Sequence, residues 1–330
     1  MSTIPSTMSA PGPKKIMVTG ALGQIGTELV EELRSKFGND NILATDIRKI
    51  EDNPGLHNGP FETLSVIDYD SMDRLVKEYD IQAIYHLAAI LSATGEEKPE
   101  LCKKINIGGT ISVLETAKNN NLKIYAPSSI AVFGPDAPKK APQITPLNPT
   151  TVYGKTKVTG EKLANEYWHN YGVDVRGLRY PGLISWKSPA GGGTTDYAVE
   201  IFHAALEKGH YDCFVGPETR LPMMYMDDAI DATIGIMEVS FEKIKIRTSY
   251  NLSSMDLSPR ELEKEIKKHF KHFKVKYSPD DRDELARGWP QSINDTYARN
   301  DWGWQPKFNL SKMVADIVLN LKNRYKIESV

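Results

Sequence analysis

The sequence predicts an α/β fold: a doubly wound parallel sheet with a smaller C-terminal α/β lobe. Over residues 15–180, short apolar runs typical of strands alternate with amphipathic runs typical of helices. This alternation indicates a parallel sheet covered by helices on both faces. From about Pro189 onward the expected elements become shorter and less regular. We therefore expect a tail (1–13), a sheet domain (14–188) and a second lobe (189–330), some segments of which return to the sheet.

Composition excludes several classes of protein. The 330 residues carry a formal net charge of −2, which gives no overall attraction to nucleic acid or to an anionic membrane. The most basic run, 267–276, is interpreted as a helix end that leads into a lysine-solvated edge strand. No apolar stretch reaches the roughly eighteen residues of a transmembrane helix. Cys102 and Cys213 are far apart and lack clustered histidines, so neither a disulfide framework nor a metal site is expected.

The first thirteen residues form a segment of their own. They contain three prolines and no acidic residue, and they end before Lys14 and Lys15. We interpret them as a disordered tail or as a poor organellar presequence, because the arginines of an amphipathic transit peptide are missing.

The clearest local motif follows the first expected strand (15–20). The run Gly20-Ala-Leu-Gly23-Gln-Ile-Gly26 leads directly into an expected helix (27–37). Glycines at these places permit a tight turn, close backbone approach to a pyrophosphate and close helix packing. The next strand (41–46) ends in Asp46, placed to bind the adenosine ribose about twenty residues after the last glycine. Together these signals predict a Rossmann dinucleotide-binding domain; the alternative is that Asp46 is a plain strand-end turn residue.

Charges near Asp46 bear on which dinucleotide is bound. Arg48 and Lys49 lie just beyond it and could hold a 2′-phosphate, but a carboxylate at that position would repel the phosphate. We therefore expect NAD rather than NADP. After a third strand (61–66), Asp68 sits where the chain turns into a helix (71–78). Asp68 could lie beside an adenine pocket, or it could simply start the helix, and both interpretations stay open.

The fourth expected strand (83–89) should bring Leu87 and Ala88 against the cofactor, because small residues at a strand's carboxyl end leave room for a ligand. We interpret His86, inside this apolar strand, as a core histidine rather than a base. Ser92 follows in the loop, where its hydroxyl could reach a substrate. The remaining expected elements are helices at 99–119, 151–168, 191–208, 227–238, 310–322 and after the capping box at Ser258, with strands at 123–129, 174–180 and 249–253.

Tyr153 and Lys157 stand four residues apart at the start of the expected helix 151–168. Their side chains would share one face, about 5–6 Å apart at Cβ. An ammonium about 5 Å away would lower the phenol pKa from its usual value near 10 by roughly two units. A second positive charge, such as an oxidised nicotinamide, would bring it towards neutrality, so Tyr153 is a candidate base. The alternative is that Tyr-x-x-x-Lys is a common accident on helices.

The run Gly191-Gly-Gly-Thr194-Thr195-Asp196 precedes the expected helix that runs to about residue 208. Three glycines before a capping hydroxyl would make a flexible hinge. Free backbone N–H groups at the helix start would then suit a carboxylate. The alternative is a mobile surface loop.

Taken together, these motifs resemble the extended short-chain dehydrogenase/reductase family, over nearly the whole chain and in the right order. Within that family the chain is most similar to the L-threonine 3-dehydrogenase branch, through the runs 88–93, 127–135 and 191–198. The matching pieces are Thr19 to Gly26, Asp46, His86 to Ala89, Asn106 with Gly109 and Thr110, Ser128 to Gly134, Tyr153 to Lys157, Leu178 to Tyr180, and Trp302 to Pro306.

The resemblance implies oxidation of L-threonine at its β-carbon by NAD, giving 2-amino-3-oxobutanoate. Tyr153 would take the hydroxyl proton, Lys157 would lower the tyrosine pKa and hold the ribose hydroxyls, and Ser129 would hold the substrate oxygen. Ser92, Thr194 and Thr195 are the candidates for the amino-acid end of the substrate. The expected cofactor-binding residues are Gly20, Gly23, Gln24, Ile25, Gly26, Asp46, Arg48, Asp68, Leu87, Ala88, Ala89, Asn106, Tyr153, Lys157, Tyr180, Pro181, Gly182 and Leu183.

Two alternative functions stay open. Nucleotide-sugar epimerases and dehydratases of this family place an asparagine where this chain has Pro181-Gly182-Leu183, which favours a small substrate; an epimerase would need Arg220 to point at a diphosphate. A regulator that senses NAD without turnover would not require Ser129, Tyr153 and Lys157. The resemblance also implies a homodimer in which the helix carrying Tyr153 and the helix 99–119 pair as a four-helix bundle. It further implies a mitochondrial location, with the cytoplasm as the alternative.

Overall fold

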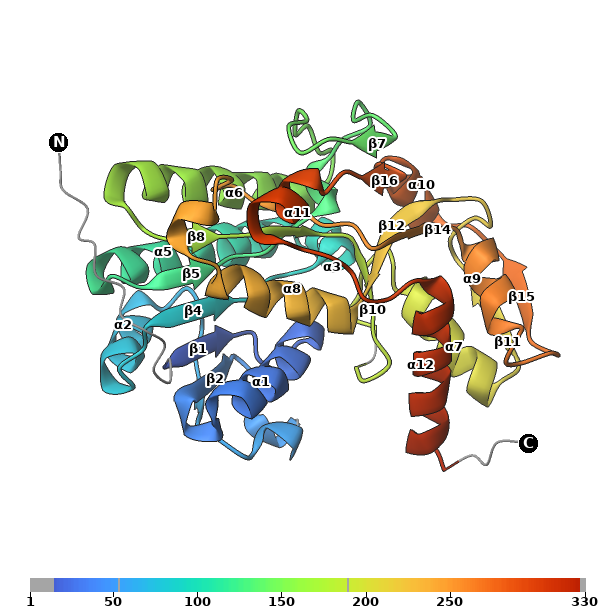
Figure 1. Cartoon of the computed structure of the whole chain (residues 1–330), viewed down its shortest axis with the longest axis horizontal. Helices are drawn as coiled ribbons and strands as arrows, with labels where there is room; N and C mark the ends of the chain where they lie inside the picture. Colours follow the sequence, from blue (N-terminus) through green and yellow to red (C-terminus); the bar gives the residue numbers. More distant parts are fainter. Residues whose placement is uncertain (1–14, 53, 189, 327–330) are drawn as a thin grey trace.

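The computed structural model describes residues 15–52, 54–188 and 190–326, so the tail expected at 1–13 lies outside the described residues. Its centre is a six-stranded sheet in which every neighbouring pair of strands is parallel (Figure 1). This confirms the predicted doubly wound α/β class. In spatial order the strands are β3 (Phe61–Thr63), β2 (Ile42–Asp46), β1 (Ile16–Thr19), β4 (Ala83–His86), β5 (Lys123–Tyr125) and β8 (Val175–Arg176).

Helices cover both faces of this sheet, because alternate residues of each buried strand point to opposite sides. One core joins Ile16 and Val18 of β1 to helices α1 (Gln24–Phe37) and α8 (Met226–Glu238). The opposite core joins Met17 of β1 to α2, α5 and α6. These three helices are α2 (Tyr69–Glu78), α5 (Gly109–Asn120) and α6 (Val152–Tyr171).

The strands expected at 123–129 and 174–180 are each broken in two. Pro127 has no N–H for a ladder and separates β5 from β6 (Ser128–Ser129). Gly177 separates β8 from β9 (Leu178–Tyr180); a Cβ there would lie 2.4 Å from the Ser249 hydroxyl oxygen. Strand β13 (Tyr250–Asn251) pairs with β9, so the C-terminal part of the chain returns to the central layer, as does α8.

The helix expected at 99–119 is less regular than its sequence suggested. It consists of α4 (Pro99–Lys103), a π-helical turn (Lys104–Gly108) and α5. A short helix that the sequence did not predict, α3 (Ser92–Glu97), precedes it. π-helical turns often occur at functional sites, and this one carries Asn106.

The second lobe has its own core, built on the sheet β10 (Gly182–Ile184), β12 (Leu221–Tyr225) and β14 (Met255–Leu257). The predicted capping box at Ser258 is present at the start of α9 (Pro259–Ile266). The basic run ends in β15 (Lys274–Tyr277), which pairs only with β11 (His210–Cys213) among the described strands, so its interpretation as an edge strand is confirmed. The remaining lobe elements are α7 (Tyr197–Glu207), α10 (Asp281–Arg287), α11 (Thr296–Trp302) and α12 (Leu310–Arg324), with the pair β7 (Lys140–Ala141) and β16 (Ser292–Ile293) beside them.

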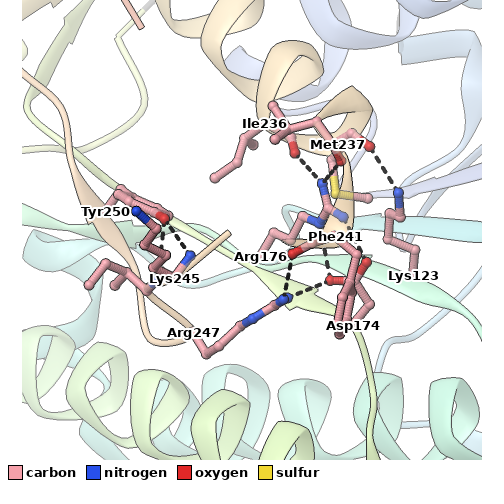
Figure 2. A network of polar contacts seen from close by, with 11 residues as sticks. Lys123, Asp174, Arg176, Ile236, Met237, Phe241, Lys245, Arg247 and Tyr250 are labelled. Atoms are coloured by element: carbon pink, nitrogen blue, oxygen red, sulfur yellow. Dashed lines mark hydrogen bonds and ion pairs between the residues drawn. The ribbon is translucent and has the colours of Figure 1, made fainter. Parts of the chain in front are cut away.

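A polar network fixes the C-terminal end of α8 to the sheet (Figure 2). Arg176, fully buried, donates to the carbonyl oxygens of Ile236 and Val239, both at 2.6 Å, and forms a two-point ion pair with Asp174. Arg247 donates to the same carboxylate at 2.8 Å. Cations at a helix C-terminus satisfy its free carbonyl groups and oppose its negative end. Within the described ranges, no helix is long and apolar enough to span a bilayer.

Candidate active site

The glycine motif forms a turn that no side chain could enter. Gly20 has φ +70°, and a Cβ on it would lie 2.6 Å from the backbone nitrogen of Ala88, which follows β4. A Cβ on Gly26 would lie 2.2 Å from the Gly20 carbonyl oxygen. Strand β1, the end of β4 and helix α1 therefore meet closely. Gly23 caps α1 without a side-chain hydrogen bond, which leaves the first backbone N–H groups of that helix open to a ligand.

Two cavities lie on either side of this turn and share Gly20, Gly23, Leu87 and Ala89 in their walls. The Asp46 cavity has a volume of about 380 Å³ and a largely apolar lining, completed by Asp46, Ile47, Arg48, Leu64, Ser65, Val66, Ala88, Ile90, Leu101 and Ile105. The Tyr153 cavity has a volume of about 230 Å³ and is completed by Gln24, Ile25, Gly26, Leu91, Ser92, Ser128, Ser129, Ile130, Tyr153, Tyr180, Pro181, Gly182, Leu183, Gly193, Thr194, Thr195, Asp196 and Trp289.

Most of the predicted site residues line one of these two cavities. Three do not, namely Asp68, Asn106 and Lys157. Asp68 is the N-cap of α2 and accepts a hydrogen bond from the Ser71 N–H at 3.1 Å, so of its two interpretations the structure supports the helix-start residue. Asn106 and Lys157 instead line a separate cavity of about 30 Å³.

Asp46 is buried at the end of β2, with both carboxylate oxygens engaged. Oδ2 accepts from the Leu22 N–H at 3.0 Å, which ties the acid to the glycine turn. Oδ1 accepts from the Arg48 backbone N–H at 3.0 Å and from its Nε at 3.1 Å. The Arg48 side chain is half exposed. An exposed guanidinium is free to swing away, so ribose hydroxyls can replace it on the carboxylate.

A dinucleotide fits this pair of cavities. The apolar walls of the Asp46 cavity suit an adenine ring, and the carboxylate suits a ribose. Gln24, the first residue of α1, has a buried Nε2 with no partner among the described residues, and it lines the Tyr153 cavity beside the glycine turn. A phosphate oxygen would satisfy that donor. The predicted residues and the geometry therefore agree on the cofactor class.

His86 and Asn106 hold the backbone next to the cofactor cavities. His86 Nδ1 lies 2.9 Å from the Thr19 hydroxyl, and burial lowers its pKa to about 3, so it is a neutral core histidine as interpreted. Asn106 accepts from the Ile90 N–H at 2.8 Å and donates to the Ile90 carbonyl at 3.0 Å. Its amide also donates to Thr156 on α6 at 3.0 Å. Asn106 thus joins the loop after β4 to the helix that carries Tyr153.

The predicted catalytic side chains come together at the start of α6. Thr151 caps that helix by accepting from the Gly154 N–H, which places Tyr153 in its first turn. The Ser129 side chain lies near the Tyr153 phenol and favours its ionised form. Lys157 Nζ lies 5.7 Å from the centre of the Tyr153 ring and donates to the Pro127 carbonyl at 3.0 Å.

The pKa expected for Tyr153 needs correction. Burial raises the pKa of Tyr153 to about 12, although the Ser129 side chain acts in the other direction. Burial also lowers the pKa of Lys157 to about 8. Lys157 alone therefore does not lower the phenol pKa, because the loss of water around the phenolate outweighs a cation whose nearest partner is a carbonyl oxygen. A further positive charge beside the phenol is needed before it can act as a base near neutral pH.

The candidate substrate residues also meet in the Tyr153 cavity. Ser92, the first residue of α3, lies with its Oγ 3.5 Å from the Thr194 Oγ1, and both side chains are buried. Thr195 lines the same wall. Tyr180 lines the cavity with its ring, but its hydroxyl bonds to Tyr125 at 2.5 Å and to Thr233, away from it.

The glycine segment differs from its prediction. Helix α7 begins at Tyr197, and the Gly192 and Gly193 N–H groups each donate to Asp196 Oδ2 at 2.7 Å. These groups are therefore not free to hold a substrate carboxylate, because the protein's own carboxylate occupies that place. Burial raises the pKa of Asp196. Asp196 was not predicted as a site residue, although an aspartate three residues after a glycine is a capping signal that could have indicated it. Trp289 was not predicted either, and the sequence offers no signal for it.

The charges around the Tyr153 cavity are few. Among the described residues that line it there is no lysine and no arginine, and Asp196 is the only acidic side chain. Arg220, which an epimerase would need at a diphosphate, instead pairs with Glu261 and donates to the Asp256 carbonyl at 2.5 Å. No group of three or more potential metal ligands occurs in the part of the chain that the structure describes.

Among known proteins, the chain is similar to epimerase/dehydratases and to L-threonine dehydrogenases. A family model described as the NAD dependent epimerase/dehydratase family matches residues 16–252. An uncharacterized epimerase/dehydratase of Staphylococcus aureus (strain MRSA252) is 48% identical over 302 residues, covering 91% of this chain and 94% of that protein. The solved apo form of a monomeric L-threonine 3-dehydrogenase from a metagenome database is 53% identical with a TM-score of 0.90, covering 94% of this chain and 99% of that one. The holo form of a GalE-like L-threonine dehydrogenase from Cupriavidus necator is 44% identical with a TM-score of 0.91, covering 93% and 100%.

These relatives bear on location and assembly. The staphylococcal relative is bacterial, and bacteria have no mitochondria, which argues against the mitochondrial location expected from the resemblance. The metagenome enzyme is described as monomeric, so it lends no support to the expected homodimer.

Proposed function

The chain belongs to the NAD dependent epimerase/dehydratase family, and we propose that it oxidises L-threonine at the β-carbon to 2-amino-3-oxobutanoate. Membership makes it an enzyme that uses NAD on a Rossmann-type fold, as its motifs predicted. The two solved relatives described above are L-threonine dehydrogenases, whereas the staphylococcal one is uncharacterized. The substrate must therefore be argued from the cavity.

The choice of substrate rests on one observation. Among the described residues that line the Tyr153 cavity, Asp196 is the only acidic side chain, and there is no lysine or arginine. A half-buried carboxylate attracts the ammonium of an amino acid and repels the diphosphate of a sugar nucleotide. The hydroxyls of Ser92 and Thr194 can donate to the substrate carboxylate. A volume of about 230 Å³ suits a small molecule beside the nicotinamide end of the cofactor. These features support an amino acid over a sugar nucleotide.

The proposed reaction moves one hydride and one proton. NAD supplies the acceptor for the hydride that leaves the β-carbon of threonine. Tyr153, as phenolate, takes the proton of the substrate hydroxyl, while Ser129 donates a hydrogen bond to the oxygen that becomes the ketone. Lys157, whose Nζ donates to the Pro127 carbonyl and lies 5.7 Å from the centre of the Tyr153 ring, would contribute positive charge near the phenol. The assembly of these three side chains supports turnover rather than NAD sensing alone.

We expect Asp196→Asn to weaken L-threonine binding. The asparagine oxygen can still accept from the Gly192 and Gly193 N–H groups, so the change removes the charge and keeps the loop. Losing a charge-assisted hydrogen bond to the ammonium should cost about 1.5–3 kcal/mol, which raises the threonine KM roughly 10- to 100-fold. NAD affinity should stay close to that of the wild type.

The control for this prediction is Asp212→Asn, which removes an exposed aspartate from the same lobe and should change neither KM nor NAD affinity. A hydroxy compound without an amino group should also be insensitive to Asp196→Asn. An unchanged threonine KM in Asp196→Asn would show that the ammonium binds elsewhere. The function itself is tested by NADH formation with L-threonine and by product analysis with sugar nucleotides, whose epimerisation or dehydration leaves no net NADH.

A further inference from the structure

A buried ion pair lies directly behind the catalytic group. Glu161 stands on α6 four residues beyond Lys157, one helical turn further along the same face. Its carboxylate accepts from Arg179 at two points, Nε to Oε1 at 2.8 Å and NH2 to Oε2 at 2.7 Å. The side chains are only 3% and 5% exposed. This geometry makes the pair rigid and shields it from solvent.

Each partner of this pair is linked to a residue that lines the Tyr153 cavity, Glu161 by a hydrogen bond and Arg179 by its place in the strand. Glu161 Oε1 also accepts from the Ser128 hydroxyl at 2.6 Å, and Ser128 precedes Ser129 in β6. Arg179 precedes Tyr180 in β9. The two strands pair in register, with Ser128 opposite Arg179 and Ser129 opposite Tyr180. The pair therefore joins α6, β6 and β9 at the point where all three reach the cavity.

The remaining donor of Arg179 extends this connection to Gln143 and to strand β13. Its NH1 donates to the Gln143 carbonyl at 3.0 Å and to Asn251 Oδ1 in β13 at 3.2 Å. These contacts give a hydrogen-bond partner to all three guanidinium nitrogens of Arg179 and to both carboxylate oxygens of Glu161. A buried ion pair seldom stabilises a fold more than apolar side chains of similar size, because its desolvation offsets its attraction. Stability alone gives no reason for two charges here.

We propose that Glu161 and Arg179 are a positioning pair, which holds Ser129 and Lys157 at the places from which they act on Tyr153. The proposal rests on the proposed dehydrogenase reaction, because it concerns the same three side chains. Glu161 also shares with Lys157 the wall of a cavity of about 30 Å³, and its charge opposes the effect of burial on the ammonium. Glu161 thereby acts on Tyr153 through its neighbours and without touching the substrate.

The test compares Glu161→Gln, Arg179→Gln and the double variant. Each single change leaves one buried charge without its partner, so both should lower the Tm strongly. In the double variant the two glutamines can hydrogen-bond to each other, so the Tm should recover. Its kcat for L-threonine should nevertheless remain about 10- to 100-fold below wild type, because misplacement of catalytic groups by even 1 Å has effects of this order. Threonine KM and NAD affinity should stay close to those of the wild type.

Arg176→Gln is the matched control, since Arg176 is another buried arginine of the same chain segment with a carboxylate partner, Asp174 (Figure 2). Its network holds α8 and does not reach the Tyr153 cavity. This variant should lose Tm as the single variants do, yet keep its kcat at temperatures below its transition. A double variant with recovered Tm and wild-type kcat would overturn the proposal. So would an equal loss of kcat in Arg176→Gln.

A second readout separates this proposal from the choice of substrate. In NAD-bound enzyme with carbon-13-labelled tyrosine, the Tyr153 resonance, assigned by its loss in Tyr153→Phe, can be titrated without threonine. The double variant should titrate at higher pH than the wild type, because Ser129 and Lys157 no longer favour the phenolate. An unchanged titration would contradict the positioning role even if threonine were not the substrate. Failure of wild-type turnover with a shifted titration would instead overturn only the proposed function.

Discussion

Tyr153→Phe should lower kcat for L-threonine oxidation by about 10²–10⁴-fold, the range typical of a lost general base. The phenylalanine ring can fill the same buried place, so only the phenolic hydroxyl is removed. NAD affinity should therefore stay close to that of the wild type, as measured by direct binding. Near-normal turnover in this variant would show that the proton goes to another group.

The pH profile gives this prediction a second check. Because burial raises the pKa of Tyr153 to about 12, the phenol is protonated in the free enzyme near neutral pH. A base must lose its proton to act, so the rate of oxidation with NAD bound should rise with pH as the phenolate fraction grows. The positive charge of oxidised nicotinamide should bring this rise below pH 12. Tyr153→Phe should lose the rise altogether.

Asp46→Ala should reverse much of the preference for NAD over NADP. In the wild type the carboxylate would repel a 2′-phosphate, and like charges placed together cost several kcal/mol. Arg48 now pairs with Asp46 through Nε at 3.1 Å and NH2 at 3.3 Å, so the change frees a guanidinium for the phosphate. We expect the ratio of kcat/KM values for NAD and NADP to fall by about 10²–10³-fold.

Two further variants sharpen that experiment. Asp46→Asn can keep the hydrogen bond from the Leu22 N–H while losing the charge, so it should shift the preference in the same direction without disturbing the turn. Adding Arg48→Ala to Asp46→Ala should remove the gain with NADP. A wild-type preference for NADP, or an unchanged cofactor preference in Asp46→Ala, would contradict the assignment of Asp46 to the ribose.

The features that sequence could predict are those with a local signal. The glycine turn, the acid at the end of β2 and the pair Tyr153 and Lys157 each have a fixed spacing that reflects one strand or helix. The structure brings the glycine turn, Asp46 and Tyr153 to adjoining cavities because they lie at the same edge of a parallel sheet, whereas Lys157 lines neither cavity. The break at Pro127 was readable by the same kind of reasoning, since proline cannot donate to a ladder.

The features that sequence could not predict depend on tertiary contacts. Whether the N–H groups of Gly192 and Gly193 were free depended on where the Asp196 side chain turned. The raised pKa of Tyr153 depended on burial, which the spacing to Lys157 does not report. Glu161 and Arg179 are eighteen residues apart and meet only because α6 packs on β6, which pairs with β9.

The proposed function is tested most directly by incubating the wild-type enzyme and NAD separately with L-threonine, with a threonine analogue that lacks the amino group, and with a set of sugar nucleotides. NADH formation is measured in each case, and the sugar nucleotides are also analysed for changed products, because epimerisation or dehydration leaves no net NADH. We predict NADH from L-threonine, with 2-amino-3-oxobutanoate as the product, and little NADH from the analogue, because Asp196 then lacks an ammonium to bind. Sugar nucleotides should neither be converted nor inhibit, since no described lysine or arginine lines the Tyr153 cavity. Conversion of a sugar nucleotide with no NADH from threonine would contradict the proposed function.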